Sequence, residues 1–97
     1  LALSELMPVH RDFAFIVSDD TPADKVLRAV KGADKTLIAN VTLFDVYQGK
    51  GVEDGHKSLA LDVTLSPKTE TLTDKDIETV TKKIITQAAK AGAVLRR

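Results

Sequence analysis

The sequence predicts an α+β fold in which four antiparallel strands form one sheet and two helices cover one of its faces. Apolar and polar residues alternate over 9–17, 36–47 and 57–65, which is typical of strands with one buried face. Apolar residues instead recur at helical spacing over 21–32 and 73–92. These segments predict the order strand, helix, strand, strand, helix, with one more strand to follow.

The strand segments differ in their expected positions in the sheet. Val9 to Val17 is apolar on both faces at its centre, as expected of an interior strand. The second and third strands are joined by a loop containing Gly49, Gly51 and Gly55, a composition suited to a long hairpin. Ala93 to Arg96 can form a short last strand.

Each helix has a recognisable start and end. Thr21 is expected to cap the first helix, with Asp24 completing a capping box. Gly32 is expected to end it. The second helix begins with a second capping signature at 73–76 and is expected to end at Gly92.

Right-handed crossovers join these elements into the split β-α-β, or ferredoxin-like, arrangement. The first and third strands then lie at the centre of the sheet. One face meets the helices, and its expected core residues are Phe13, Phe15, Phe44, Val46, Leu59, Leu61 and Val63. The other face is open and carries Asp12, Ala14, Ile16, Asp45, Tyr47, Ser58 and Ala60. An open face with apolar residues at its centre needs a cover, either another domain or a ligand.

The register between the second and third strands follows from keeping their apolar rows together. It is expected to pair Phe44 with Leu61, Asp45 with Ala60, Val46 with Leu59, and Tyr47 with Ser58. A ring, a carboxylate, a hydroxyl and a small residue then share one patch, which suits a planar ligand such as a nucleobase. The alternative is that Tyr47 is only a good strand residue on a half-exposed sheet, and without further information this alternative is preferred.

The composition indicates one globular domain spanning residues 1–97. The chain is 43% hydrophobic and 29% charged, with 14 basic and 14 acidic side chains and no net charge. Zero net charge counts against a free-standing nucleic-acid binder that depends on charge alone, but it allows local base recognition. Because the chain begins with Leu1, it is expected to be a piece of a longer polypeptide.

Several kinds of chemistry are not expected in this domain. The chain has no cysteine, which excludes disulfides, thiolate metal sites and cysteine nucleophiles. His10 and His56 have no second ligand at metal-binding spacing, and Ser58 stands in no nucleophile motif. No apolar run approaches the ~18 residues of a membrane span, and no signal peptide is expected. We therefore expect a cytoplasmic domain with no catalytic residue and no metal ion.

The open face is expected to carry some local positive charge. Four cations, Arg11, Lys57, Arg96 and Arg97, are placed where they could lie near it. For Arg11, an ion pair with the adjacent Asp12 at the start of the strand is the preferred interpretation.

Four sequence motifs carry a family resemblance. They are Arg-Asp-Phe-Ala-Phe at 11–15, Leu-Phe-Asp-Val-Tyr-Gln-Gly at 43–49, Gly-His-Lys-Ser-Leu-Ala at 55–60 and Thr-Leu-Thr-Asp at 71–74. In this order they closely resemble the C-terminal, ferredoxin-fold anticodon-binding domain of the bacterial phenylalanyl-tRNA synthetase beta subunit. The resemblance covers nearly the whole chain, and the second and third motifs are highly specific as a pair.

The resemblance implies a function and a set of site residues. In that family the domain holds the anticodon loop of tRNA(Phe), within an alpha-two beta-two enzyme whose alpha subunit carries out aminoacylation with ATP and Mg2+. It implies a non-catalytic, RNA-binding role for this chain, whose partners would be tRNA(Phe), the rest of the beta subunit and the alpha subunit. The positions around the first anticodon base match Asp45, Tyr47 and Ser58. The neighbouring platform would be Ala14, Ile16 and Ala60, and the phosphate or edge contacts would be Arg11, Lys57 and Arg96.

Two other functions occur on the same predicted fold. An acylphosphatase-type enzyme would need a phosphate cradle with an arginine in the first loop and an asparagine on a strand. Here Asp19 and Asp20 occupy that loop, and Asn40 is the only asparagine. A ligand-sensing regulatory domain would also be compatible with the open face, and fold alone does not decide between these functions.

Overall fold

The computed structural model describes residues 7–67 and 72–96 and contains the six predicted elements in the predicted order. Strand β1 is Val9–Ser18, helix α1 is Ala23–Lys31, and strand β2 is Ile38–Tyr47. Strand β3 is His56–Leu65, helix α2 is Asp74–Lys90, and strand β4 is Val94–Leu95. The observed boundaries differ from the predicted ones by at most two residues, which is ordinary for element ends.

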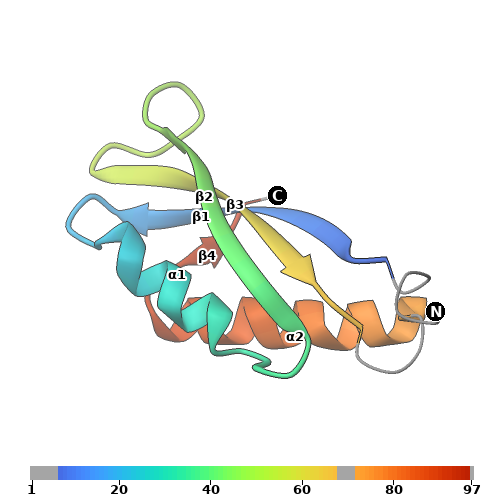
Figure 1. Cartoon of the computed structure of the whole chain (residues 1–97). Coiled ribbons are helices and arrows are strands. Elements are labelled where there is room, and N and C mark those ends of the chain that lie inside the picture. The colour runs from blue at the N-terminus through green and yellow to red at the C-terminus, as the bar shows by residue number, and fades with distance from the viewer. Residues whose placement is uncertain (1–6, 68–71, 97) are drawn as a thin grey trace.

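The sheet has the strand order β2-β3-β1-β4, with β1 and β3 at its centre. All three strand pairs are antiparallel. Both helices lie against the same side of the sheet, as Figure 1 shows, and the other side is left without a helix. The ferredoxin-like arrangement predicted from the sequence is therefore confirmed.

The core lies between the sheet and the two helices. Its fully buried members come from β1, β3 and both helices: Phe15, Val17, Val26, Val30, Leu59, Leu61, Val63, Val80, Ile84 and Ala88. Phe13 is partly buried and stacks on Phe15, with the ring centroids 5.9 Å apart. The predicted alternation of β1 and β3 is thus correct at every core position named for these two strands.

Strand β2 departs from the predicted register at a β-bulge. Leu43, not Phe44, lies opposite Leu61, and Asp45 follows opposite Ala60. The extra residue Phe44 has no partner and is 57% exposed. The predicted pairing of Phe44 with Leu61 and the predicted burial of Phe44 were therefore wrong, because a bulge places two residues of one strand opposite one of its neighbour.

Val46 is a second error in the predicted core. It does pair with Leu59 as predicted, but it is 49% exposed. Strand β2 lies at the edge of the sheet, and at Val46 it is near its end, where it is less covered than the central strands. Correct register therefore does not guarantee burial on an edge strand.

The two helix starts have different outcomes. Thr73 accepts a hydrogen bond from the backbone N–H of Asp76, and the Asp76 carboxylate accepts one from the backbone N–H of Thr73. This reciprocal pair is the predicted capping box of α2. In α1 the capping position is Pro22, and no side chain caps the helix. The predicted cap by Thr21 was wrong.

Candidate nucleic-acid interface

Two rows of residues cross the open face of the sheet from edge to edge. In one row Tyr47 lies opposite Ser58, Ser58 opposite Ile16, and Ile16 opposite Val94. In the other row Asp45 lies opposite Ala60 and Ala60 opposite Ala14, and the Arg96 N–H donates to the Ala14 carbonyl. The six residues predicted for the ring, the polar groups and the platform therefore share one continuous patch with Arg96.

Tyr47 is held in place by two contacts of its own. Its hydroxyl donates a hydrogen bond of 2.7 Å to the carbonyl of Lys50 in the β2–β3 loop. The guanidinium carbon of Arg96 lies 5.8 Å from the centre of its ring, within the range of a cation–π interaction. The side chain is still 39% exposed, so the ring is positioned in advance and remains accessible.

The contact between Arg96 and Tyr47 spans the width of the sheet. Tyr47 is on edge strand β2, and Arg96 directly follows β4 at the opposite edge. The central strands present only the methyl groups of Ala14 and Ala60 along the row that Arg96 shares with Asp45, so the long side chain can cross above them. Larger residues at these two positions would block this path.

The β2–β3 loop also reaches the arginine. Gly51 has a φ of +93°, and a β-carbon built there would lie 3.2 Å from a terminal nitrogen of Arg96. Both the backbone conformation and the close approach favour glycine at this position. Glycine is therefore favoured at position 51 by the turn, as predicted, and also by the nearness of the Arg96 side chain that contacts Tyr47.

A hollow of about 480 Å³ lies between this loop and β4. Ile16 and Val94 contribute apolar walls from the sheet, and Val52 contributes one from the loop. Glu53 and His56 add polar groups at its margin, where Oε1 of Glu53 lies 3.3 Å from Nδ1 of His56. A volume of this size can hold a planar ring system beside the patch.

The end of the open face away from Tyr47 is acidic. Asp12 and Asp62 lie directly opposite one another on β1 and β3, and His10 lies 3.3 Å from Asp62. A hydrogen bond with Asp62 raises the pKa of Asp12, with smaller raising contributions from desolvation and from the charge of Asp62. A hydrogen bond to the Asp62 carboxylate favours the protonated form of Asp12, and the like charge opposite it acts in the same direction.

Two of the predicted site residues lie away from the open face. Arg11 pairs with Val63 and Lys57 pairs with Val17, so both lie on the same side of the sheet as the core residues of their strands. Arg97 lies outside the described residues. Arg11 donates to the carbonyl of His10 rather than to Asp12, and the Lys57 ammonium lies 3.4 Å from the carbonyl of Asp19. The predictions that these two cations line the open face and that Arg11 pairs with Asp12 were wrong. The alternation of side chains along each strand would have excluded both cations from the open face.

Sequence reasoning also missed parts of the site. The Lys50 carbonyl and the Val94 side chain are not recognisable from residue type, because a backbone acceptor and a lone valine carry no pattern.

Among the described residues no group of three or more His, Cys, Asp or Glu could hold a metal ion. Within the same residues no helix is long and apolar enough to cross a membrane.

The comparison with protein families decides what kind of domain this is. The family model described as the ferredoxin-fold anticodon binding domain matches residues 4–96. The chain belongs to this family. This family agrees with the ferredoxin-like fold and with the resemblance predicted from the sequence.

Individual relatives of this anticodon-binding domain agree with the family match. The chain is 48% identical over 97 residues to the phenylalanine–tRNA ligase beta subunit of Bradyrhizobium diazoefficiens. It is 50% identical over 97 residues to the proteins of the same name from Rhodospirillum rubrum and Paramagnetospirillum magneticum. Each match covers 99% of this chain and 12% of the relative, so the chain spans about an eighth of the length of these proteins. The acylphosphatase-type and ligand-sensing alternatives receive no support from these matches.

Proposed function

We propose that the open face binds the anticodon loop of tRNA(Phe), as the anticodon-binding part of a phenylalanine–tRNA ligase beta subunit. The observation that carries the proposal is the patch around Tyr47, where an accessible ring, a carboxylate and a small platform meet in a domain of the anticodon-binding family. The domain would span residues 1–97 and take no part in the chemistry. Aminoacylation with ATP and Mg2+ would occur elsewhere in a cytoplasmic alpha-two beta-two enzyme.

The roles of the residues follow from their positions in the patch. Tyr47 offers a ring on which a base can stack, and stacking accepts any base. Asp45, two residues before Tyr47 on β2, offers a carboxylate to the edge of that base, and Ser58, opposite Tyr47, offers a hydroxyl from a residue that is 4% exposed. Ala14, Ile16 and Ala60 form a flat floor. Arg96 is the cation of this set placed to meet a phosphate or a base edge.

This arrangement predicts selective but weak binding by the isolated domain. Phosphate neutralisation supplies much of the affinity of nucleic-acid complexes, and the open face carries the Asp12–Asp62 pair as well as a single arginine. Specificity would come from the loop bases, and the remaining affinity would come from surfaces other than the open face.

An NMR titration of the isotopically labelled 97-residue chain tests the proposal. The probe is an anticodon stem-loop of tRNA(Phe), and the control is the same stem with an unrelated loop sequence. We expect the amide resonances of 45–47 and 58–60 to shift with the first probe and to shift much less with the second. Equal shifts with both loops, or no shift in these strands, would contradict the proposal.

A further inference from the structure

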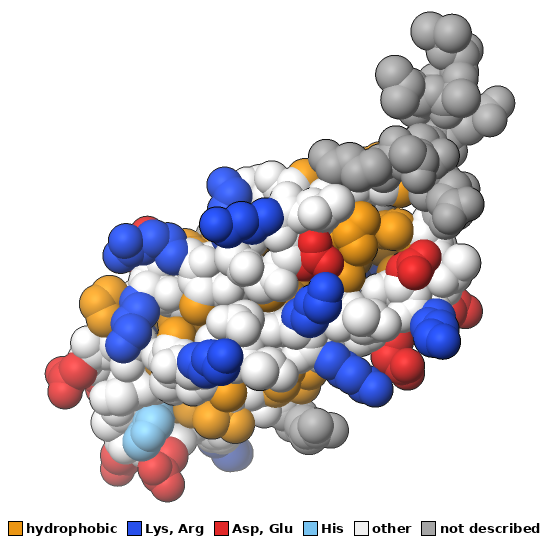
Figure 2. All heavy atoms as spheres, turned by 90° about the horizontal axis from the view of Figure 1, so that it is seen from below, with side chains coloured by type: hydrophobic (Ala, Val, Ile, Leu, Met, Phe, Trp, Pro, Cys, Tyr) orange, Lys and Arg blue, Asp and Glu red, His pale blue; other side chains and the backbone are white. Residues whose placement is uncertain are grey.

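The helix side of the domain carries most of its positive charge. The segments 23–37 and 79–90, which form α1, the turn after it and most of α2, contain seven basic residues and two acidic ones. The basic residues are Lys25, Arg28, Lys31, Lys35, Lys82, Lys83 and Lys90. The other described residues contain five basic and ten acidic side chains, so the net charge of zero conceals two surfaces of opposite sign. We call the seven basic residues the helix-layer patch; Figure 2 shows lysine and arginine side chains spread across this side of the molecule.

The two acidic residues of these segments are already engaged. Asp24 forms an ion pair of 2.8 Å with Arg28, one helical turn along α1. The Asp34 carboxylate accepts hydrogen bonds from the backbone N–H groups of Thr36 and Leu37 and lies 3.3 Å from the Lys83 ammonium. Desolvation raises the pKa of Asp34, but these hydrogen bonds outweigh it and leave the pKa below its usual value. Both acids therefore serve the local structure, and five lysines of the patch lie beyond salt-bridge distance of any described carboxylate.

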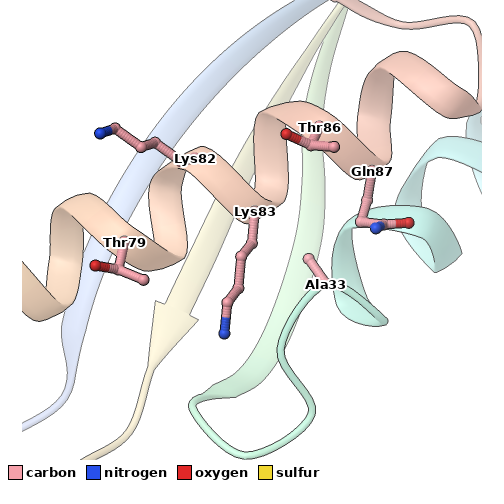
Figure 3. Close-up of a pocket in the computed structure, with 6 residues that line it drawn as sticks. All are labelled: Ala33, Thr79, Lys82, Lys83, Thr86 and Gln87. Carbon is pink, nitrogen blue, oxygen red and sulfur yellow. The ribbon is translucent and has the colours of Figure 1, made fainter.

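Three neighbouring hollows run along this patch. The first, of about 470 Å³, lies between α2 and the turn after α1, and its lining includes Lys82, Lys83 and the Thr79 and Thr86 side chains. Figure 3 shows Lys83 extending from α2 past Ala33 of this turn, with Lys82 leaving the helix in another direction. The Thr79 hydroxyl donates to the Lys75 carbonyl, so the groups of this hollow that can donate to phosphate oxygens are the ammonium groups and the Thr86 hydroxyl.

The second and third hollows continue the track. Gln87 lines both the first and the second, and Arg28 lines both the second and the third. The second adds Lys25 and Lys90, and the third adds Lys31 and Lys35. No carboxylate lines any of the three. The result is a continuous surface of donors that can follow an extended polyanion.

The composition of this surface favours RNA over a protein partner. Protein interfaces are depleted in lysine, and their cores are formed by aromatic and apolar residues. The large exposed hydrophobic residues of the described chain are Met7, Phe44, Val46, Tyr47 and Val94, and none of them lies on a helix. A lysine-rich surface whose helices expose no large hydrophobic side chain matches the sequence-independent contacts that proteins make to the sugar-phosphate backbone.

We propose that the helix-layer patch is a second RNA-binding surface, which holds the phosphate backbone of an RNA segment distinct from the one at the open face. It reads no sequence, because lysine contacts to phosphate carry no base information. It complements the open face, which offers a stacking ring but little positive charge. The inference does not depend on base stacking at Tyr47, since the two surfaces lie on opposite sides of the sheet.

The test measures binding of a tRNA(Phe) transcript between 50 and 200 mM salt, for the 97-residue chain and a triple variant, Lys31→Gln, Lys35→Gln and Lys82→Gln. Each phosphate contact contributes about 0.7 to 0.9 to the slope of log affinity against log salt. Losing three contacts should make the slope shallower by about 2 to 3. The factor by which affinity falls between 50 and 200 mM salt should therefore be about 20- to 40-fold smaller for the triple variant. Unfolding by denaturant is measured alongside, because a change of binding counts only if the variants fold.

Two controls separate the patch from net charge. Lys75→Gln is matched to Lys82→Gln, since both lysines are on α2 two turns apart, but Lys75 lies among the acidic residues of the first turn. We expect Lys82→Gln to make the slope shallower and Lys75→Gln to leave it unchanged. A further variant adds Asp20→Asn, Asp54→Asn and Glu78→Gln to the triple variant, which restores zero net charge without restoring the patch. It should still bind with the shallower slope.

The outcomes distinguish this inference from the proposed function. Unchanged slopes in the triple variant, with weaker binding by Tyr47→Ala, would overturn the helix-layer patch and leave the open face intact. Recovery of the full slope in the charge-restored variant would also overturn it, because net charge would then be the cause. If the triple variant binds tRNA normally but loses association with the other subunits of the ligase, the patch is a protein interface and the inference is wrong.

Discussion

Replacing Tyr47 by alanine tests the open face most directly. One base–aromatic stack contributes about 1–3 kcal/mol to binding. The Tyr47 ring already has the Arg96 guanidinium at 5.8 Å, an interaction that contributes about 0.5–1 kcal/mol at an exposed site. A base that takes the same face of the ring replaces this contact, so the net loss on Tyr47→Ala should be about 0.5–2 kcal/mol. That corresponds to a roughly 2- to 30-fold weaker complex with tRNA(Phe).

The stability of the Tyr47→Ala variant should fall only by the loss of two surface contacts. The substitution removes the hydrogen bond to the Lys50 carbonyl, which contributes about 0.5–1.5 kcal/mol, and the cation–π contact with Arg96. It leaves no buried cavity, because the side chain is 39% exposed. We therefore expect the free energy of unfolding to fall by no more than about 2.5 kcal/mol.

Two further variants make the measurement specific. Tyr47→Phe keeps the ring and loses the hydroxyl, so it should retain most of the binding. Phe44→Ala removes another exposed aromatic side chain from the same strand, three residues away at the bulge, and should change neither binding nor stability appreciably. Binding is measured by calorimetry and corrected for the folded fraction from a denaturation curve. If Phe44→Ala weakens binding as much as Tyr47→Ala, or if Tyr47→Phe loses as much as Tyr47→Ala, the ring of Tyr47 is not the stacking platform.

The remaining predictions concern stability and are checked by denaturant or thermal unfolding. Leu61→Ala should cost about 2–5 kcal/mol, because the side chain is fully buried on a central strand and its loss leaves a cavity. Thr73→Ala should cost about 1 kcal/mol by removing the cap that bonds the Asp76 N–H. Asp12→Asn should raise the melting temperature at neutral pH, because it removes one charge of the pair with Asp62. The pKa of Asp12 is raised in the folded state, so folding favours its protonated form, and stability falls as pH rises from 3.8 through the raised pKa. The advantage of Asp12→Asn should therefore disappear as pH falls below 3.8.

Each of these has a contrary result that is easy to recognise. A mild effect of Leu61→Ala would mean that the sheet and helices do not enclose that position. An unchanged melting temperature for Thr73→Ala would mean that the capping box contributes nothing in solution. A gain from Asp12→Asn that persists at low pH would show that charge repulsion is not its source.

The sequence predicted the fold because its local signals agree with one another. Strict alternation in β1 and β3 placed Phe15, Leu59 and Leu61 in the core, and the capping box fixed the start of α2. The same alternation failed at Phe44, because a bulge inserts a residue without any mark in the apolar pattern. The cap expected from Thr21 failed for a related reason, since residue type permits a hydrogen bond but does not make it.

The site was predictable in part for the same physical reasons. Register alone brought Asp45, Tyr47, Ser58 and Ala60 together. The bulge does not disturb their pairing, because its extra residue comes one position before Asp45. The contact between Arg96 and Tyr47 depends on the strand order and on small residues between them, which only the folded structure reveals. The helix-layer patch was likewise invisible in a net charge of zero, because composition averages over surfaces that face in opposite directions.

The irregular strand β2 has a consequence for how the domain behaves in a crowded solution. A sheet edge with regular, unpaired backbone groups is a template on which another chain can add a strand and begin to aggregate. Here β2 forms one edge and has two breaks of register, at Ala39 and Phe44, while the opposite edge strand β4 has only two residues. Neither edge offers a long regular ladder to a second molecule. The domain can therefore keep one sheet face uncovered for a ligand without polymerising through its edges.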